Sequence, residues 1–437
     1  MPTTPAPAAP PRSYTCPKPD CGWTGDFDAA FVAWCRSCGH GADPSPADAD
    51  AELSDRARDR LAREAQANSA RALALFEELK AGADPRPHAR TRRAVAVFSV
   101  AVHIPFVLMV AGVVTWVATT PGNPVAWFLG ALGLVIAMVV RPRVGRAPRG
   151  RGWLRRAQLP ALFGVLDKVA DAVGAQAPDA VAFNARVNAS TARSGLRQRQ
   201  VMILGVPLWT VLSGDQRVAL LGRELAHQVN GDSTNTVLAA SAQSSLDEWA
   251  VLLNPRGWRG TGGGGGDEVG FVMQVAAFLV PVMLLPFYLT FLGLRRLHER
   301  VWFATKPRAE YLADRLAAKA AGTDATARLT DTLVLVGVVD NFVSRQAARR
   351  GKVDLWDELR AYADAVPDHE RERLRLLDER SGASVDSSHP PTYLRRRLLL
   401  ETPAEPGSLR ISDAEWAAVD AELAPLLKAM ERDLLLG

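Results

Sequence analysis

The sequence lacks several features that would assign it to a common class of protein. Residues 1–90 contain no apolar run of the kind that a secretory signal needs, so we expect no cleaved leader. A glycine-rich stretch at 259–270 lacks the lysine and the spacing of a phosphate-binding loop, and we interpret it as a flexible linker. The excess of positive charge is only +5, and the arginines gather beside apolar segments. That distribution favours membrane topology over a nucleic-acid surface, so we expect no nucleic-acid partner.

Apolar residues, by contrast, are plentiful. They make up 48% of the chain beside 23% charged residues, which indicates apolar blocks next to polar ones. A length of 437 residues is enough for two or three domains. Most segments have helical composition, and short β-type runs occur only in the central part, at AVAFNA and VMILG. We therefore predict an α+β fold that is mainly α.

Cysteine is scarce, and its four residues all lie close together in the N-terminal part. They form the pattern C-x4-C-x13-C-x2-C, with Cys16, Cys21, Cys35 and Cys38. Four thiolates in two close pairs suit a tetrahedral structural zinc ion, so residues 13–41 are predicted to form a small zinc ribbon. The alternative is two disulfides, which would require an oxidising compartment.

Two uncharged apolar segments predict a transmembrane helical hairpin over residues 94–140. The first, 94–118, has 25 residues, which is long enough to cross a bilayer core of about 30 Å. The second, 125–140, is shorter. Arginines precede the first segment and follow the second, whereas the turn between them carries no charge, so the positive-inside rule places both ends in the cytoplasm. The cysteines then lie in a reducing space, which supports zinc over disulfides.

A third apolar block, at 271–294, is long enough to span a membrane but is interrupted by Pro281 and Pro286. A single crossing would put the segments on its two sides in different compartments. Arg295 and Arg296 at its end favour the cytoplasm. We expect the block to return to the side from which it came, either as a proline-broken re-entrant pair or as a helix resting on the membrane or on the protein core.

These features predict a division of the chain into five parts. They are a disordered segment (1–12), the zinc ribbon (13–41), a helical and basic linker (42–93), the transmembrane hairpin (94–140) and a globular domain that contains the third apolar block (153–437).

The segment GRELAHQVNGD, residues 222–232, nearly matches the His-Glu-x-x-His motif of zinc proteases. In that motif two histidines one helical turn apart hold the metal, and the glutamate handles the proton of a bound water. Glu224 and His227 stand at the expected positions, but Arg223 occupies the position of the first ligand. Asp215 is the expected N-cap of this helix.

A later helix supplies further candidates. Glu310, in the sequence EYLAD, is a candidate third metal ligand. Asp314 follows one helical turn later and lies on the same helix face. It is placed to accept a hydrogen bond that orients a ligand histidine.

Three motifs in this order, ELAHQVNGD, RAEYLADRLAA and SSHPPTYLRRR, resemble the HtpX-like membrane metallopeptidases. This gluzincin family also includes the CAAX prenyl endopeptidases. The resemblance covers roughly residues 94–400 and implies a zincin-like domain that hydrolyses peptide bonds with a zinc-bound water. By position, Glu224 would be the general base, His227 and Glu310 zinc ligands, and His389 a group facing the substrate oxyanion.

The resemblance also implies an edge strand that holds an extended peptide, and the run QVMILG at 200–205 is the candidate for it. The departure from the family pattern is Arg223. A guanidinium has no acceptor lone pair and stays protonated, so it cannot coordinate zinc. Two protein ligands remain where a catalytic site needs three, which puts a catalytic zinc in doubt. We hypothesise that Arg223 pairs with Glu310 and that this site is metal-free.

Three functions remain open from the sequence. The first is a membrane-bound zinc endopeptidase that acts on membrane or misfolded proteins. The second is a pseudopeptidase that binds such polypeptides as a scaffold without cutting them. The third, weaker alternative makes the ribbon a docking or nucleic-acid module. The first two predict a polypeptide partner and a lipid bilayer, in a multi-pass protein of the cell membrane with its ribbon and globular domain in the cytoplasm.

Overall fold

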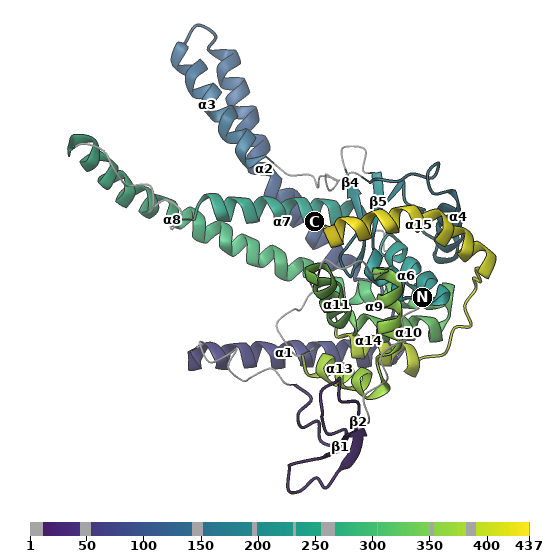
Figure 1. Cartoon of the computed structure of the whole chain (residues 1–437). Helices are drawn as coiled ribbons and strands as arrows, with labels where there is room; N and C mark the ends of the chain where they lie inside the picture. Colours follow the sequence, from purple (N-terminus) through teal and green to yellow (C-terminus); the bar gives the residue numbers. More distant parts are fainter. Residues whose placement is uncertain are drawn as a thin grey trace.

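The computed structural model describes residues 12–43, 54–141, 152–194, 199–229, 233–254, 267–303, 305–349, 354–381 and 390–436. Of the segment expected to be disordered, only Arg12 is among them, and it begins a strand. The described helices are α1 (Asp55–Lys80), α2 (Ala89–Thr119), α3 (Pro124–Val140), α4 (Pro160–Val173), α5 (Val206–Val211), α6 (Gly214–Ala226), α7 (Ser233–Leu252), α8 (Asp267–Phe303), α9 (Lys306–Ala321), α10 (Thr323–Leu333), α11 (Val336–Arg349), α12 (Leu355–Asp364), α13 (Asp368–Ser381), α14 (Thr392–Glu401) and α15 (Asp413–Leu436). The predicted mainly α class with a small sheet is confirmed (Figure 1).

Two small sheets complete the fold. Strands β1 (Arg12–Thr15) and β2 (Thr24–Phe27) form an antiparallel pair in the N-terminal module. Strands β3 (Ala180–Asn184), β4 (Ala189–Ser194) and β5 (Arg199–Gly205) form a three-stranded sheet in the order β3-β5-β4, with β3 parallel and β4 antiparallel to β5.

The expected edge strand at 200–205 is therefore wrong, because these residues form β5 at the centre of the sheet. Its run of apolar residues is buried, as is typical of a strand that is covered on both faces. The strand at the edge on the side of α6 is β4, and α6 packs against it.

The main core lies between this sheet and helices α4, α6, α9 and α15. Fully buried members include Phe163, Leu166 and Leu221. Helices α6 and α9 approach each other closely at Gly222, where an added Cβ would lie 3.4 Å from the Cα atom of Ala317. A small residue at this point allows the two helices to bring their side chains into one site.

Helices α2 and α3 form a hairpin that projects from the core (Figure 1). Helix α2 is long and apolar enough to cross a membrane, and α3 is a shorter apolar helix. The buried residues of α2 are confined to its first half, at Val95, Ser99 and Val102, where it packs on α7 and α8. The second half is paired with α3 and has several exposed large apolar side chains, among them Val107, Leu108 and Val114. Helix α2 begins at Ala89, so residues 89–93 of the expected linker belong to this helix.

The third apolar block lies within α8, which continues through Pro281 and Pro286. The proline-broken re-entrant pair is therefore wrong, because each proline removes one backbone hydrogen bond while the rest of the helix persists. Only the last residues of the block rest on the protein core: Phe291 and Leu294 pack against a buried cluster that includes Trp249, whereas Met283 and Phe287 are exposed.

The end of α8 is joined to α2 and α7 by a buried polar network. The ring of His298 contacts the Ser99 hydroxyl through Nε2 at 3.1 Å and the Gln243 side-chain oxygen through Nδ1 at 2.9 Å. Gln243 also donates a hydrogen bond of 2.9 Å to Glu299. The three helices therefore form one bundle below the exposed hairpin.

Candidate active site

Two helices carry the residues that the sequence singled out. Arg223 and Glu224 lie in the last turn of α6, and His227 is its C-cap. Glu310 and Asp314 lie on one face of α9, which packs along α6. The N-cap of α6 is Ser213, which forms a capping box with Gln216, so the expectation of Asp215 as N-cap is wrong.

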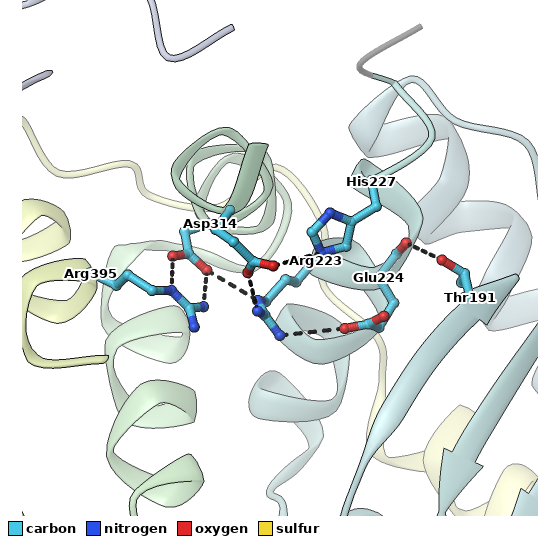
Figure 2. A network of polar contacts seen from close by, with 7 residues as sticks. Thr191, Arg223, Glu224, His227, Asp314 and Arg395 are labelled. Atoms are coloured by element: carbon cyan, nitrogen blue, oxygen red, sulfur yellow. Dashed lines mark hydrogen bonds and ion pairs between the residues drawn. The ribbon is translucent and has the colours of Figure 1, made fainter. Parts of the chain in front are cut away.

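The guanidinium of Arg223 lies among three carboxylates (Figure 2). It donates a short hydrogen bond from Nη2 to Oε2 of Glu310. Its Nη1 lies 3.4 Å from Oε1 of Glu224, and its Nε lies 3.4 Å from Oδ1 of Asp314. The predicted ion pair between Arg223 and Glu310 is therefore present. All four side chains are largely buried, so these charges interact with little screening by water.

Asp314 is held by a second arginine, Arg395 of α14. The guanidinium donates two parallel hydrogen bonds to the carboxylate, from Nε at 2.7 Å and from Nη2 at 2.6 Å. Both side chains are at least 95% buried. Asp314 therefore contacts Arg395 and Arg223, rather than orienting His227. Arg395 was missed from the sequence because it stands in the run YLRRR, where nothing distinguishes an inward-facing arginine from its neighbours.

Glu224 is buried beside Arg223. Burial raises the pKa of its carboxyl above the usual range, and the positive charge of Arg223 opposes that rise. The backbone carbonyl of Glu224 accepts a hydrogen bond of 3.1 Å from the Thr191 hydroxyl on β4. The edge strand and the candidate base are thus in direct contact.

His227 lies at the more open side of the site, with 28% of its side chain exposed. Its Nε2 is 3.9 Å from Oε1 of Glu310. As the C-cap, it stands just beyond the last residue of α6, Ala226. His389, the candidate oxyanion group, lies outside the described residues.

The donor set does not fit a catalytic zinc. The position of the first ligand holds a guanidinium, which has hydrogen-bond donors only. Its Nη2 is bound to Glu310, so a residue expected as a metal ligand is already occupied by a cation. Among the residues that the structure describes, the site provides two protein ligands, His227 and Glu310, fewer than the three of known catalytic zinc sites.

The cysteine cluster does fit a metal ion. The Sγ atoms of Cys16 and Cys38 are 3.6 Å apart, and those of Cys21 and Cys35 are 3.5 Å apart. Tetrahedral zinc with Zn–S bonds of about 2.3 Å places its sulfurs about 3.8 Å apart. Within the described parts of the chain, these cysteines are the one group of three or more His, Cys, Asp or Glu side chains close enough to share an ion.

The local environment acts differently on the four sulfurs. The four thiols are free, and the backbone N–H of Cys38 points at the sulfur of Cys35 at 3.5 Å. Hydrogen bonding from the backbone of Trp23 lowers the pKa of the Cys21 thiol to about 7, whereas burial raises the pKa of the Cys16 thiol to about 12. Zinc needs its cysteines in the deprotonated form.

Residues 157–402 match the family described as Peptidase family M48. This interval runs from α4 through α14 and includes both helices of the candidate site. The fold and the site therefore belong to the metallopeptidase class, and the chain is a member of family M48. The match begins after the α2–α3 hairpin, which the resemblance in the sequence had included. Searches among curated proteins and among solved structures each found no match to the chain.

Proposed function

We propose that this M48 protein is a membrane-anchored pseudopeptidase, a scaffold that binds extended polypeptides but does not hydrolyse them with zinc. The observation that carries the proposal is the ion pair between Arg223 and Glu310. A permanently charged guanidinium stands where the family motif has a metal-binding imidazole. It provides positive charge to the site without any capacity to activate water as a metal does.

The electrostatics of the site support a structural role for this cation. Glu224 and Glu310 are both buried and would otherwise be two like charges in a partly dry site. A zinc ion would offset that repulsion in an active family member. Here Arg223 contacts both carboxylates, so the site is stabilised without a metal.

The edge strand supports polypeptide binding. Within the described residues, β4 is hydrogen-bonded to β5 on one side only. An edge strand of this kind can pair with an extended peptide through its backbone N–H and C=O groups. Because Thr191 of β4 contacts Glu224 directly, a peptide bound there would pass beside the former catalytic face. The proposed client is therefore an unfolded or extended segment of a membrane or misfolded protein.

Membrane anchoring is assigned to the α2–α3 hairpin. Its exposed apolar side chains include Leu108, Val114, Phe128 and Met138. An apolar surface of this extent is stabilised by lipid rather than by water. The arginines at the start of α2 and after α3 favour, by the positive-inside rule, a multi-pass protein with both ends of the hairpin, the ribbon and the peptidase-like domain in the cytoplasm.

The test is an assay of binding and cleavage with an unfolded protein such as reduced casein. The unaltered chain should bind it and leave it intact. Arg223→His restores an imidazole and should allow slow, chelator-sensitive cleavage, which the double variant Arg223→His with Glu224→Gln should lack. Chelator-sensitive cleavage by the unaltered chain would contradict the proposal and favour the endopeptidase alternative.

A further inference from the structure

The N-terminal ribbon is docked on helix α13 of the peptidase-like domain (Figure 1). The indole N–H of Trp34 donates a hydrogen bond of 3.2 Å to the backbone carbonyl of His369. The ring of Phe31 packs edge-on against the His369 ring, with centroids 5.9 Å apart. Arg36 forms an ion pair of 2.8 Å with Glu372. Two ribbon residues between the cysteine pairs, Phe31 and Trp34, and one residue inside the second pair, Arg36, therefore contact the first turns of α13.

The turn that carries the last cysteine also touches α13. Arg380 donates a hydrogen bond of 3.2 Å to the carbonyl of Gly39, next to Cys38. Gly39 has φ +68°, and an added Cβ would lie 2.0 Å from Arg380 Nη2 and 3.1 Å from a methyl group of Leu376. Glycine favours this backbone conformation, and a larger residue here would displace the Arg380 guanidinium from its contact with the turn.

A buried ion pair strengthens the contact. Arg373 binds Glu370 through two hydrogen bonds of 2.7 and 2.6 Å, and both residues are more than 90% buried. The same guanidinium donates a hydrogen bond of 2.7 Å to the carbonyl of Ala42 at the end of the ribbon. A buried charge pair is costly unless all of its hydrogen bonds are made, and the Ala42 carbonyl completes the bonding of Arg373. Undocking of the ribbon would break this hydrogen bond and expose the pair to water.

Helix α13 is linked in turn to the candidate site. Near its end, Asp378 accepts a hydrogen bond of 3.0 Å from the backbone N–H of Tyr393 in the first turn of α14. Helices α13 and α14 also share Asp331 of α10, which pairs with Arg375 and with Arg396. Two residues after Tyr393, Arg395 holds Asp314, which lies beside Arg223.

We propose that the ribbon is an internal clamp, whose bound metal fixes α13 and thereby holds Arg395 of α14 in place at the candidate site. The face of the ribbon that could bind a partner is already covered by α13 of the same chain. The ribbon is therefore a positioning element of the peptidase-like domain, and loss of its metal loosens α13 and α14. This inference rests on the zinc assignment for the four cysteines, but it does not depend on whether the protein hydrolyses peptides.

The contact predicts a specific effect of metal loss. Cysteines Cys35 and Cys38 define the turn that ends at Gly39, and without the ion this turn has no covalent or coordinate restraint. The ribbon groups that contact α13, among them Arg36 and the Gly39 carbonyl, would then no longer be held in place. The backbone amides of α13 and α14 should exchange faster by about tenfold, the factor expected from the loss of one or two net hydrogen bonds.

The experiment is hydrogen–deuterium exchange on the full chain in detergent micelles, with zinc-loaded and chelator-treated samples compared. Exchange in α13 and α14 should rise on zinc removal, whereas α4, which is remote from the ribbon, should be unchanged. Unchanged exchange in α13 after zinc removal would overturn the clamp. Absence of zinc from the untreated protein would overturn the zinc assignment, and with it the metal dependence.

A second pair of variants tests docking without touching the cysteines. Arg36→Glu opposes Glu372 with a like charge and should speed exchange in α13 while zinc remains bound. Adding Glu372→Arg reverses both charges, restores the pair, and should return exchange toward that of the unaltered chain. If Arg36→Glu retains zinc and leaves α13 unchanged, or if the reversed pair fails to restore protection, the ribbon does not act through this contact.

Discussion

The carboxylate of Asp314 accepts two hydrogen bonds, of 2.7 and 2.6 Å, from the guanidinium of Arg395. Both side chains are at least 95% buried. This pair joins α9 to α14 and so connects one helix of the candidate site to the C-terminal part of the family domain. Because two parallel hydrogen bonds restrict the orientation of both side chains, this pair fixes the position of α14 along α9 as well as the distance between the two helices.

Removal of Arg395 should be strongly destabilising. Arg395→Met leaves the buried Asp314 carboxylate with Arg223 alone, at 3.4 Å, and the loss of one partner of a buried pair costs about 3–5 kcal/mol. Thermal or urea unfolding in detergent measures the change. The matched control is Arg328→Met, which breaks an exposed pair with Asp324 and should cost about 0.5 kcal/mol or less. Equal effects of the two variants would show that the Arg395 pair does not stabilise the fold.

The site contains one group whose titration gives a defined pH dependence. Burial raises the pKa of Glu224, so its charged form is disfavoured in the folded protein. Stability attributable to this group is full below the unfolded pKa of about 4.3 and is lost as pH rises through the higher folded pKa. Glu224→Gln removes this loss of stability at high pH, because glutamine does not ionise. Its amide oxygen can still accept a hydrogen bond from Arg223.

Glu224→Gln should therefore raise the melting temperature at pH 8, and the gain should shrink as the pH falls toward 4. The control is Glu358→Gln on α12, a remote helix, which should show no such trend. A gain from Glu224→Gln that grows toward acid pH would mean that the carboxyl is stabilised, rather than penalised, by its surroundings.

The close approach of α6 and α9 predicts a size limit at Gly222. Alanine places its Cβ 3.4 Å from the Cα atom of Ala317 and 3.6 Å from a methyl group of Val173, which are tolerable contacts. Gly222→Ala should therefore be neutral or stabilising by up to about 1 kcal/mol, from helix propensity. Gly222→Leu should cost about 1–3 kcal/mol or more, because the larger side chain forces the helices apart. Unfolding measurements on the two variants that gave equal stabilities would contradict this packing.

The sequence contained enough information to predict the pair of Arg223 with Glu310. A helix places residues of one motif on one face, and a cation at a ligand position needs a carboxylate partner once it is buried. The central place of β5 could also have been predicted, since the continuous apolar run VMILG is typical of a strand covered on both faces. It was instead assigned to the edge by analogy with the family.

Other features could not be predicted, because they depend on contacts between distant parts of the chain. The docking of Trp34 on His369 joins residues 335 positions apart. Neither residue type nor local spacing indicates such a partner. The choice of Arg395 among three successive arginines depends on how α14 is rotated against α9, which only packing decides. The continuity of α8 through its two prolines has the same origin, since a proline weakens a helix locally without fixing its direction beyond that point.

The most direct test of the central claim is the number of zinc ions bound per chain, before and after loss of the ribbon site. The unaltered protein should carry one zinc, and the variant with Cys35→Ser and Cys38→Ser should carry none, because Arg223 fills the second position. Two zinc ions in the unaltered chain, with one retained in the cysteine variant and lost when His227 is replaced by alanine, would contradict the account.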